Sequence, residues 1–187
     1  MRRKVYTKDQ ILKAAYDVIS TEGFSKFTAR NIAKKMGIST QPIYLEFKNM
    51  QDLKNTLVET IMRDLQENVF PKPHTGNEII DLGINYINFA RENHNLYVSL
   101  YVDEYGGGQL MHQFSYDYFK DLVKKSTIYA DLTEEQIALL HETTWITVSG
   151  IASLMSSGII NPTEEEVIKL IEQAIDSTLK AKEVERI

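Results

Sequence analysis

The chain has 187 residues, of which 43% are hydrophobic, so it has enough apolar side chains to bury a core. It contains no cysteine, which excludes disulfides, thiolate catalysis and cysteine-ligated zinc. No apolar segment approaches membrane-spanning length, and no unbroken apolar segment follows the basic start as it would in a signal peptide. We therefore expect a soluble cytoplasmic protein with no membrane partner.

The charge is distributed unevenly along the chain. A formal net charge of −5 would by itself disfavour nucleic acid as a partner. Residues 1–60, however, hold eleven basic and six acidic side chains, so they carry +5 and the remainder carries −10. This asymmetry predicts a basic module joined to an acidic body.

Four helices are predicted in the basic part. Apolar residues from Ile11 to Ile19 recur at helical spacing, and Gly23 ends this first helix. Thr28 is a good cap for the second helix. Ser39 is expected to cap a short third helix, and Asn49 to cap a long fourth one. The prolines and glycine between residues 71 and 76 end the fourth helix and make the best linker candidate in the chain.

The acidic part is also predicted to be helical. Its helix-start signals are Asn77, Asn95, Thr133 with Gln136, and Thr163 with Glu166, the last two pairs being capping boxes. The second of these helices stops at three glycines, residues 106–108, and a further helix holds Leu110, Phe114, Tyr118 and Leu122. Since no strand alternation is present, the expected fold class is all-α.

The segment 37–47 combines a proline with a polar front edge. The first four N–H groups of a helix lack intrahelical partners, so Pro42 breaks no hydrogen bond if Ser39 is the cap. The helix then presents a polar tip followed by a tyrosine, namely Ser39, Thr40, Gln41 and Tyr44. A short helix of this kind, set after a helix and a glycine, is typical of a recognition helix in the major groove.

Apolar, glycine, cap and aromatic positions follow one another in a specific order between Thr7 and Leu53. They are Ile11, Ala14, Ala15, Gly23, Phe24, Thr28, Ile32, Ala33, Gly37, Ser39, Ile43, Tyr44, Phe47 and Leu53. This pattern resembles the N-terminal DNA-binding domain of the TetR family of transcriptional regulators. The resemblance covers about a quarter of the chain; the remainder matches only as an all-helical body of suitable length.

The resemblance implies an architecture and a function. A three-helix DNA-binding domain, residues 1–48, would hold the helix-turn-helix, and residues 49–187 would bind a ligand and dimerise. The chain would be a ligand-responsive regulator, expected to be a repressor and not an enzyme. As a homodimer it would bind a palindromic operator in double-stranded DNA and be released by a small-molecule inducer.

Six residues are expected to contact DNA: Thr28, Ser39, Thr40, Gln41, Tyr44 and Lys48. The resemblance implies that Tyr44 touches the phosphate backbone, although it could also be an aromatic at the rim of the domain. Thr40 and Gln41 have side chains that can reach base edges, but cap or solvent roles are equally open. Lysines suit phosphates and are also ordinary surface residues.

The last two helices are expected to form the dimer interface. Their apolar stripes include Val148, Ile151, Met155, Val167, Ile171, Ala174 and Thr178. Paired across a two-fold axis, the stripes would make a four-helix interface.

The body is rich in aromatic residues that could line an apolar cavity for the effector. The candidates are Tyr86, Phe89, Tyr101, Phe114, Tyr118 and Trp145, for which simple core packing is the competing interpretation. Acidic residues lie close to them in sequence, so a cationic, lipophilic ligand is conceivable.

Signals for other chemistry are weak. His141-Glu142 begins a zincin-like motif, but Trp145 stands where the second histidine belongs, so we expect no metal and no cofactor. The three glycines lack the lysine that a P-loop requires. Two other classes stay open: a small all-helical enzyme acting on an aromatic or lipidic substrate, and an interaction module without a ligand. Binding to duplex DNA separates the regulator from both.

The sequence departs from the family at Met50, where family members commonly carry a lysine that would contact a phosphate. Lys48 could substitute for it, or the backbone N–H groups at the helix start could bind phosphate alone.

Overall fold

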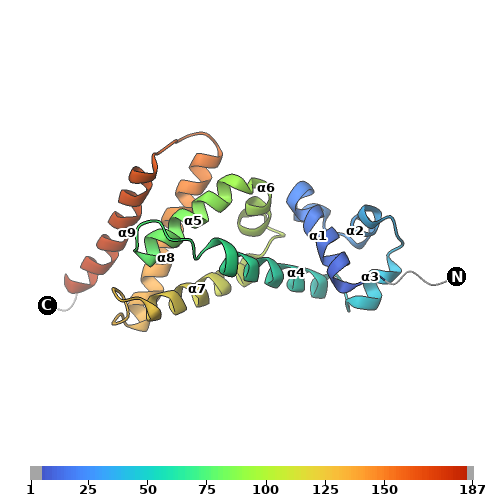
Figure 1. Cartoon of the computed structure of the whole chain (residues 1–187), viewed down its shortest axis with the longest axis horizontal. Coiled ribbons are helices and arrows are strands. Elements are labelled where there is room, and N and C mark those ends of the chain that lie inside the picture. Colours follow the sequence, from blue (N-terminus) through green and yellow to red (C-terminus); the bar gives the residue numbers. More distant parts are fainter. Residues whose placement is uncertain (1–5, 185–187) are drawn as a thin grey trace. The chain divides into compact units, whose positions relative to one another are not determined.

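The computed structural model describes residues 6–184, with backbone only for residue 109 and residues 181–184. All regular structure in this range is helical, which confirms the all-α class. The α-helices are α1 Lys8–Glu22, α2 Ala29–Met36, α3 Gln41–Glu46, α4 Met50–Asp64, α5 Glu78–Glu92, α6 His94–Tyr97, α7 Gly108–Lys125, α8 Glu134–Ser156 and α9 Glu164–Val184 (Figure 1). Of the helices described, none is long and apolar enough to cross a membrane.

Short non-α turns extend three of these helices. A 3₁₀ turn, Phe24–Lys26, follows α1, and π-helical turns at Leu65–Val69 and Val98–Val102 continue α4 and α6. The wider turn after α4 is closed by a hydrogen bond from the Phe70 N–H to the carbonyl of Leu65. The long fourth helix expected from the sequence is therefore α-helical only as far as Asp64.

Most of the expected helix starts are confirmed. Thr28 Oγ1 accepts from the Asn31 N–H at 3.2 Å, and Asn49 Oδ1 accepts from the Asp52 N–H at 2.9 Å. The Thr133–Gln136 capping box is complete in both directions. These caps satisfy N–H groups that the first turn of a helix leaves without partners, so the helix boundaries follow directly from local side-chain chemistry.

Two expected helix starts are wrong by a residue. Asn95 lies inside α6, which begins at His94. Thr40, not Ser39, occupies the cap position of α3, and it makes no side-chain cap bond. Its backbone is already in the helical region, with φ −74° and ψ −16°, so the chain enters α3 through a tight turn without a hydroxyl cap. Pro42 still lies within the first turn, where it costs no hydrogen bond.

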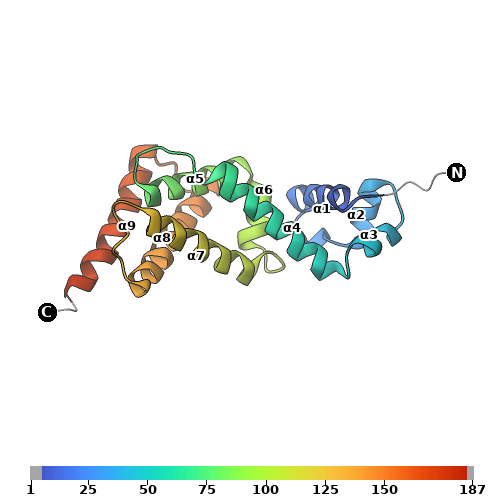
Figure 2. The ribbon, with the colours of Figure 1, turned by 60° about the horizontal axis from the view of Figure 1, so that its bottom comes forward.

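The contacts divide the chain into two compact units. The first unit consists of the described residues up to Asp64 together with Asn95–Met111, and the second of Leu65–His94 together with the described residues from His112 onward. Within the first unit, α1, α2 and α3 pack together with α4 (Figure 2). Its core includes Ile11, Ala15, Ile19, Ile32, Ile43, Phe47, Leu53 and Leu57, each at most 2% exposed.

The segment 71–76 is not a free linker, because α5 holds it through two buried side chains. Asp81 accepts from both the N–H and the hydroxyl of Thr75, each at 2.7 Å. The Asn85 amide donates to the carbonyls of Phe70 and Lys72, at 3.0 and 2.7 Å. Burial would raise the pKa of Asp81, but the hydrogen bonds from Thr75 and its neighbours outweigh burial and lower it.

The core of the second unit lies where α5, α8 and α9 pack on one another. Gly83 on α5 marks the closest approach: a Cβ at this position would lie 2.8 Å from Ile171 Cδ1 and 3.0 Å from Val148 Cγ1. Only glycine leaves room for both side chains without a shift. Five of the seven residues expected at the dimer interface are buried within the single chain, namely Val148, Ile151, Val167, Ile171 and Thr178.

Candidate DNA-binding site

The helix-turn-helix is built from α2 and α3, with Gly37 between them. Gly37 adopts the left-handed conformation at φ 67°, and its N–H bonds the carbonyls of Ala33 and Lys34. The Ile38 N–H then returns to the Ala33 carbonyl at 3.0 Å, which closes the end of α2. A residue with a side chain is strained at such a φ, so the sharp turn between the two helices requires glycine here.

α3 is anchored on one side and exposed on the other. Ile43 and Phe47 are 1% and 2% exposed, whereas Tyr44 is 52% and Leu45 is 71% exposed. Gln41 is exposed as well, and Thr40 is half-buried. The buried pair fixes the helix in the first unit, while its first turn and Tyr44 remain free to meet another molecule.

Thr28 and Lys48 flank this exposed surface in sequence, and both are exposed. The Thr28 oxygen already caps α2, but its hydroxyl hydrogen can still be donated to a phosphate. The backbone N–H of Lys48 is taken by Asp52 Oδ2 at 3.0 Å, so only its ammonium group is available for DNA. Asp52 also places a carboxylate in the first turn of α4, which works against phosphate binding at that helix start.

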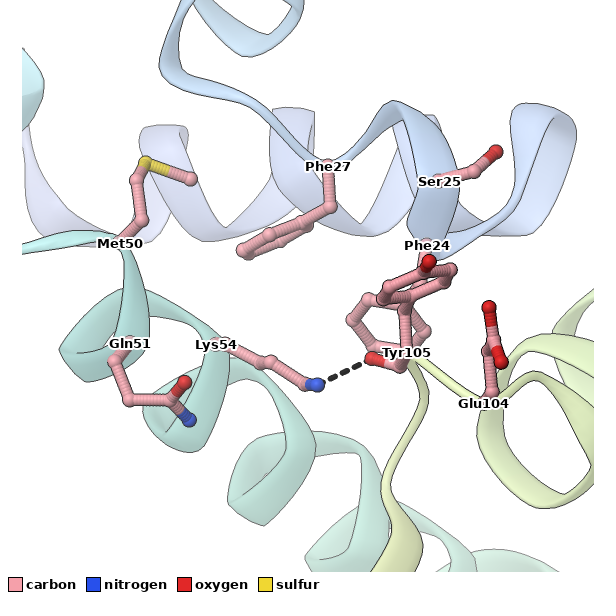
Figure 3. A pocket seen from close by; sticks show the side chains of 8 residues that line it. All are labelled: Phe24, Ser25, Phe27, Met50, Gln51, Lys54, Glu104 and Tyr105. Atoms are coloured by element: carbon pink, nitrogen blue, oxygen red, sulfur yellow. Dashed lines mark hydrogen bonds between the residues drawn. The ribbon is translucent and has the colours of Figure 1, made fainter.

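The surroundings of Met50 differ from those of a phosphate contact. Its side chain is half-buried and lines a pocket with the rings of Phe24 and Phe27 (Figure 3). Because aromatic rings contribute to the lining of this pocket, it suits the apolar thioether of Met50. The structure thus gives Met50 an apolar role in the first unit.

Residues 11–56 match the model of the TetR family, described as bacterial regulatory proteins. The matched range contains α2, α3 and the buried anchors described above. These residues therefore match the N-terminal DNA-binding domain of TetR-family regulators, and the match covers about a quarter of the chain.

Several solved structures share the fold along nearly the whole length of this chain. The fatty acid degradation regulator FadR from Bacillus halodurans is 17% identical, with 93% of this chain and 97% of that one covered at a TM-score of 0.63. A putative TetR-family regulator from Vibrio parahaemolyticus is 16% identical, with coverages of 90% and 96% and a TM-score of 0.67. SmeT, the repressor of a multidrug efflux pump of Stenotrophomonas maltophilia, is 18% identical, with coverages of 94% and 90% and a TM-score of 0.59.

The six residues expected to bind a ligand lie in different surroundings. Phe114 and Tyr118 line a half-open groove of about 490 Å³ together with Asp117, Asp121 and Leu122. Tyr86 and Phe89 are buried, and the Tyr86 hydroxyl lies 3.1 Å from Ser149 Oγ. Tyr101 belongs to the first unit, where its ring stacks on Tyr97 at 5.5 Å.

Trp145 lies in a cluster of aromatic rings that the sequence did not indicate. Its ring stacks on His141 at 5.6 Å and lies 5.3 Å from His112. His141 is buried beside Ser115 Oγ, at 2.9 Å, and burial together with His112 lowers its pKa to about 4. The Trp145 indole N–H is buried without a hydrogen-bond partner among residues 6–184. His141 is thus a neutral member of this aromatic cluster at neutral pH. Within residues 6–184, no group of acidic and histidine side chains is suited to a metal.

The outer face of the last two helices exposes apolar side chains. On α8, Leu139, Ile146 and Leu154 are 37%, 65% and 40% exposed, and Leu170 on α9 is 41% exposed. A Cβ at Gly150 would meet nothing within 4 Å, so the middle of α8 is open to close approach. The hydrophobic stripes of the sequence did not distinguish this face from the buried one.

Proposed function

We propose that this protein is a ligand-responsive transcriptional repressor of the cytoplasm. It binds a palindromic operator as a homodimer and leaves it when a small-molecule inducer binds the body. The proposal rests most directly on α3, where Ile43 and Phe47 are buried while Gln41 and Tyr44 are exposed and Thr40 is half-buried. Such a helix places side chains of the right size and polarity at a major groove.

The roles of the six DNA-binding residues divide by chemistry. Thr40 and Gln41 are proposed to contact base edges, because hydroxyl and amide groups can read the donor and acceptor pattern of the major groove. Thr28, Tyr44 and Lys48 are proposed to contact phosphates, which fixes the register of the protein on DNA. Ser39 is exposed and, not being the cap of α3, is free to join the phosphate contacts.

We propose that the dimer surface lies on the outer face of α8 and α9, and the apolar side chains exposed there support this proposal. This surface is formed by Leu139, Ile146, Gly150, Leu154 and Leu170, in place of the stripe that includes Ile171. Met155 and Ala174 are half-buried and would lie at its margin. Exposed apolar side chains on two long neighbouring helices favour association with an identical surface across a two-fold axis.

The effector is proposed to be a small molecule with an apolar body and a positive charge. The groove on α7 supports this class, because Phe114, Tyr118 and Leu122 form an apolar floor beside Asp117 and Asp121. Lys125 is the one basic residue among its lining side chains, so the groove carries a net negative charge. A lipophilic cation complements both features.

The decisive experiment is selection of bound sequences from a random duplex library, followed by fluorescence anisotropy on the selected operator. We expect a palindromic site. Thr40→Ala and Gln41→Ala should change its sequence, whereas Lys48→Ala should weaken all sequences alike and make the salt dependence shallower. Lys169→Ala removes an equal charge from exposed α9 and serves as the control. Recovery of no preferred sequence would contradict the proposal.

A further inference from the structure

The first unit contains a pocket of about 600 Å³ that the proposed function does not use. Figure 3 shows its walls: the rings of Phe24, Phe27 and Tyr105, with the thioether of Met50 at one end. Lys54 reaches across the pocket from α4, and Gln51 lies one turn before it on the same helix. The pocket therefore combines aromatic walls with a single positive charge.

The ammonium group of Lys54 is only partly satisfied by the protein. It donates to the backbone carbonyl of Tyr105 and lies 4.9 Å from the centre of the Phe24 ring. An ammonium has three donors, and the Tyr105 carbonyl uses one of them. Among the ion pairs of the described residues, none within 4.0 Å involves Lys54.

Partial burial makes the missing partners of this ammonium group more costly. Partial burial lowers the pKa of Lys54, and the negative charge of Asp103 opposes that shift without reversing it. A cation removed from water without a paired carboxylate is stabilised by any anion that enters beside it. The pocket is wide enough for a flat ring system to lie against Phe27 and Tyr105 while its charged group meets Lys54.

We propose that this pocket binds a small carboxylate attached to a flat apolar or aromatic group. Lys54 holds the carboxylate, the Gln51 amide offers a further donor, and the aromatic rings hold the apolar part. Glu104 also lines the pocket and is exposed, so its negative charge weakens the binding of an anion. The site belongs to the first unit and shares no lining residue with the groove on α7. A failure of this proposal would therefore not affect the proposed effector site.

The test uses 2-naphthoate and the neutral 2-naphthamide, which has the same ring system. The full-length protein is labelled with ¹³C at the methionine methyl groups, and the Met50 signal is assigned with Met50→Leu. We expect 2-naphthoate to shift the Met50 signal through ring currents while Met155, in the second unit, stays unchanged. 2-Naphthamide should bind at least about tenfold more weakly, as loss of a hydrogen bond between charged groups implies.

Three variants complete the test. Lys54→Leu should weaken 2-naphthoate about tenfold or more, Lys54→Arg should retain binding, and Glu104→Gln should tighten it. Thermal unfolding followed by circular dichroism shows whether each variant is folded. If Lys54→Leu does not fold, the affinities of the two probes for the wild type and for Glu104→Gln still test whether the pocket binds a carboxylate. Equal binding of both probes, unchanged binding by folded Lys54→Leu, or a shift confined to Met155 would overturn the proposal.

Discussion

The first unit and the second unit use their apolar residues differently. In the first unit, Ile43 and Phe47 are buried, and the exposed side of α3 is polar except for Tyr44 and Leu45. In the second unit the core is complete, and yet α8 and α9 still expose Leu139, Ile146, Leu154 and Leu170. A surface for DNA needs polar groups over a small fixed core, whereas a surface for a second copy needs apolar area beyond its own core.

The largest effect is expected from a charge on the outer face of α8. Ile146→Glu should give monomers, because a carboxylate at the centre of the proposed dimer surface would lose its hydration on association. Losing the linkage of two DNA-binding units should lower operator affinity by about 10²–10⁴-fold. Sedimentation and anisotropy measure the two effects. Ile128→Glu, which alters an exposed isoleucine between α7 and α8, should leave both unchanged; a dimeric Ile146→Glu would place the interface elsewhere.

Two aromatic substitutions, one at a buried and one at an exposed residue, distinguish the core side of the α3 region from its surface side. Phe47→Ala should lower the free energy of unfolding by about 3–5 kcal/mol, because it leaves a cavity at a side chain that is 2% exposed. Tyr44→Ala should change stability by no more than about 0.5 kcal/mol while weakening DNA binding. Urea denaturation and anisotropy test the pair. Equal losses of stability in both variants would mean that Tyr44 is part of the core.

The buried carboxylate of Asp81 should give the second unit a measurable acid dependence. Asp81→Asn should cost about 1–3 kcal/mol at neutral pH, because the charged acceptor of two Thr75 hydrogen bonds is lost. Since the folded state lowers the pKa of Asp81, its contribution is complete above the ordinary carboxyl pKa of about 3.9 and fades as the pH falls below it.

Denaturation across a pH series tests this, with exposed Asp176→Asn on α9 as the matched control. The difference between wild type and Asp81→Asn should shrink toward zero in acid. A difference that stays constant in acid would show that the charge of Asp81 is not what stabilises the loop.

The smallest effect concerns the start of α4. Met50→Lys should steepen the dependence of log affinity on log salt concentration by about 2 in the dimer, roughly one unit per subunit, if this helix start faces the phosphates. Met50→Ala should leave the slope unchanged, because an apolar side chain releases no counterions. Anisotropy across a salt series measures both variants. An unaltered slope for Met50→Lys would mean that α4 begins away from the DNA backbone.

The local elements of the first unit could be predicted because each depends on neighbours in sequence. Thr28 and Asn49 accept hydrogen bonds from N–H groups three residues further on, and Gly37 turns the chain through its own left-handed conformation. The cap of α3 was an exception, because Ser39 and Thr40 have equal capping chemistry and the backbone conformation of the turn selected between them. The proposed DNA-binding surface could be predicted for the same reason, because it lies on one short helix whose buried face has helical spacing.

The exposed and buried surfaces of the second unit depend on contacts between residues far apart in the chain. Ile171 and Ile146 are both apolar residues on long helices, but α5 approaches Ile171 closely at Gly83, and Ile171 is buried while Ile146 is 65% exposed. In the same way, Asp81 and Asn85 turn a segment with two prolines and a glycine into a clamped loop.

The sequence by itself determined most of the helices and caps and the helix-turn-helix, because these depend on hydrogen bonds and spacings within a few residues. Only the tertiary structure decided which apolar stripe is covered, which loop is held, and that Lys54 meets Tyr105 fifty-one residues further on. Burial and the pairing of a charge are properties of the space around a side chain, and that space is filled by distant parts of the chain.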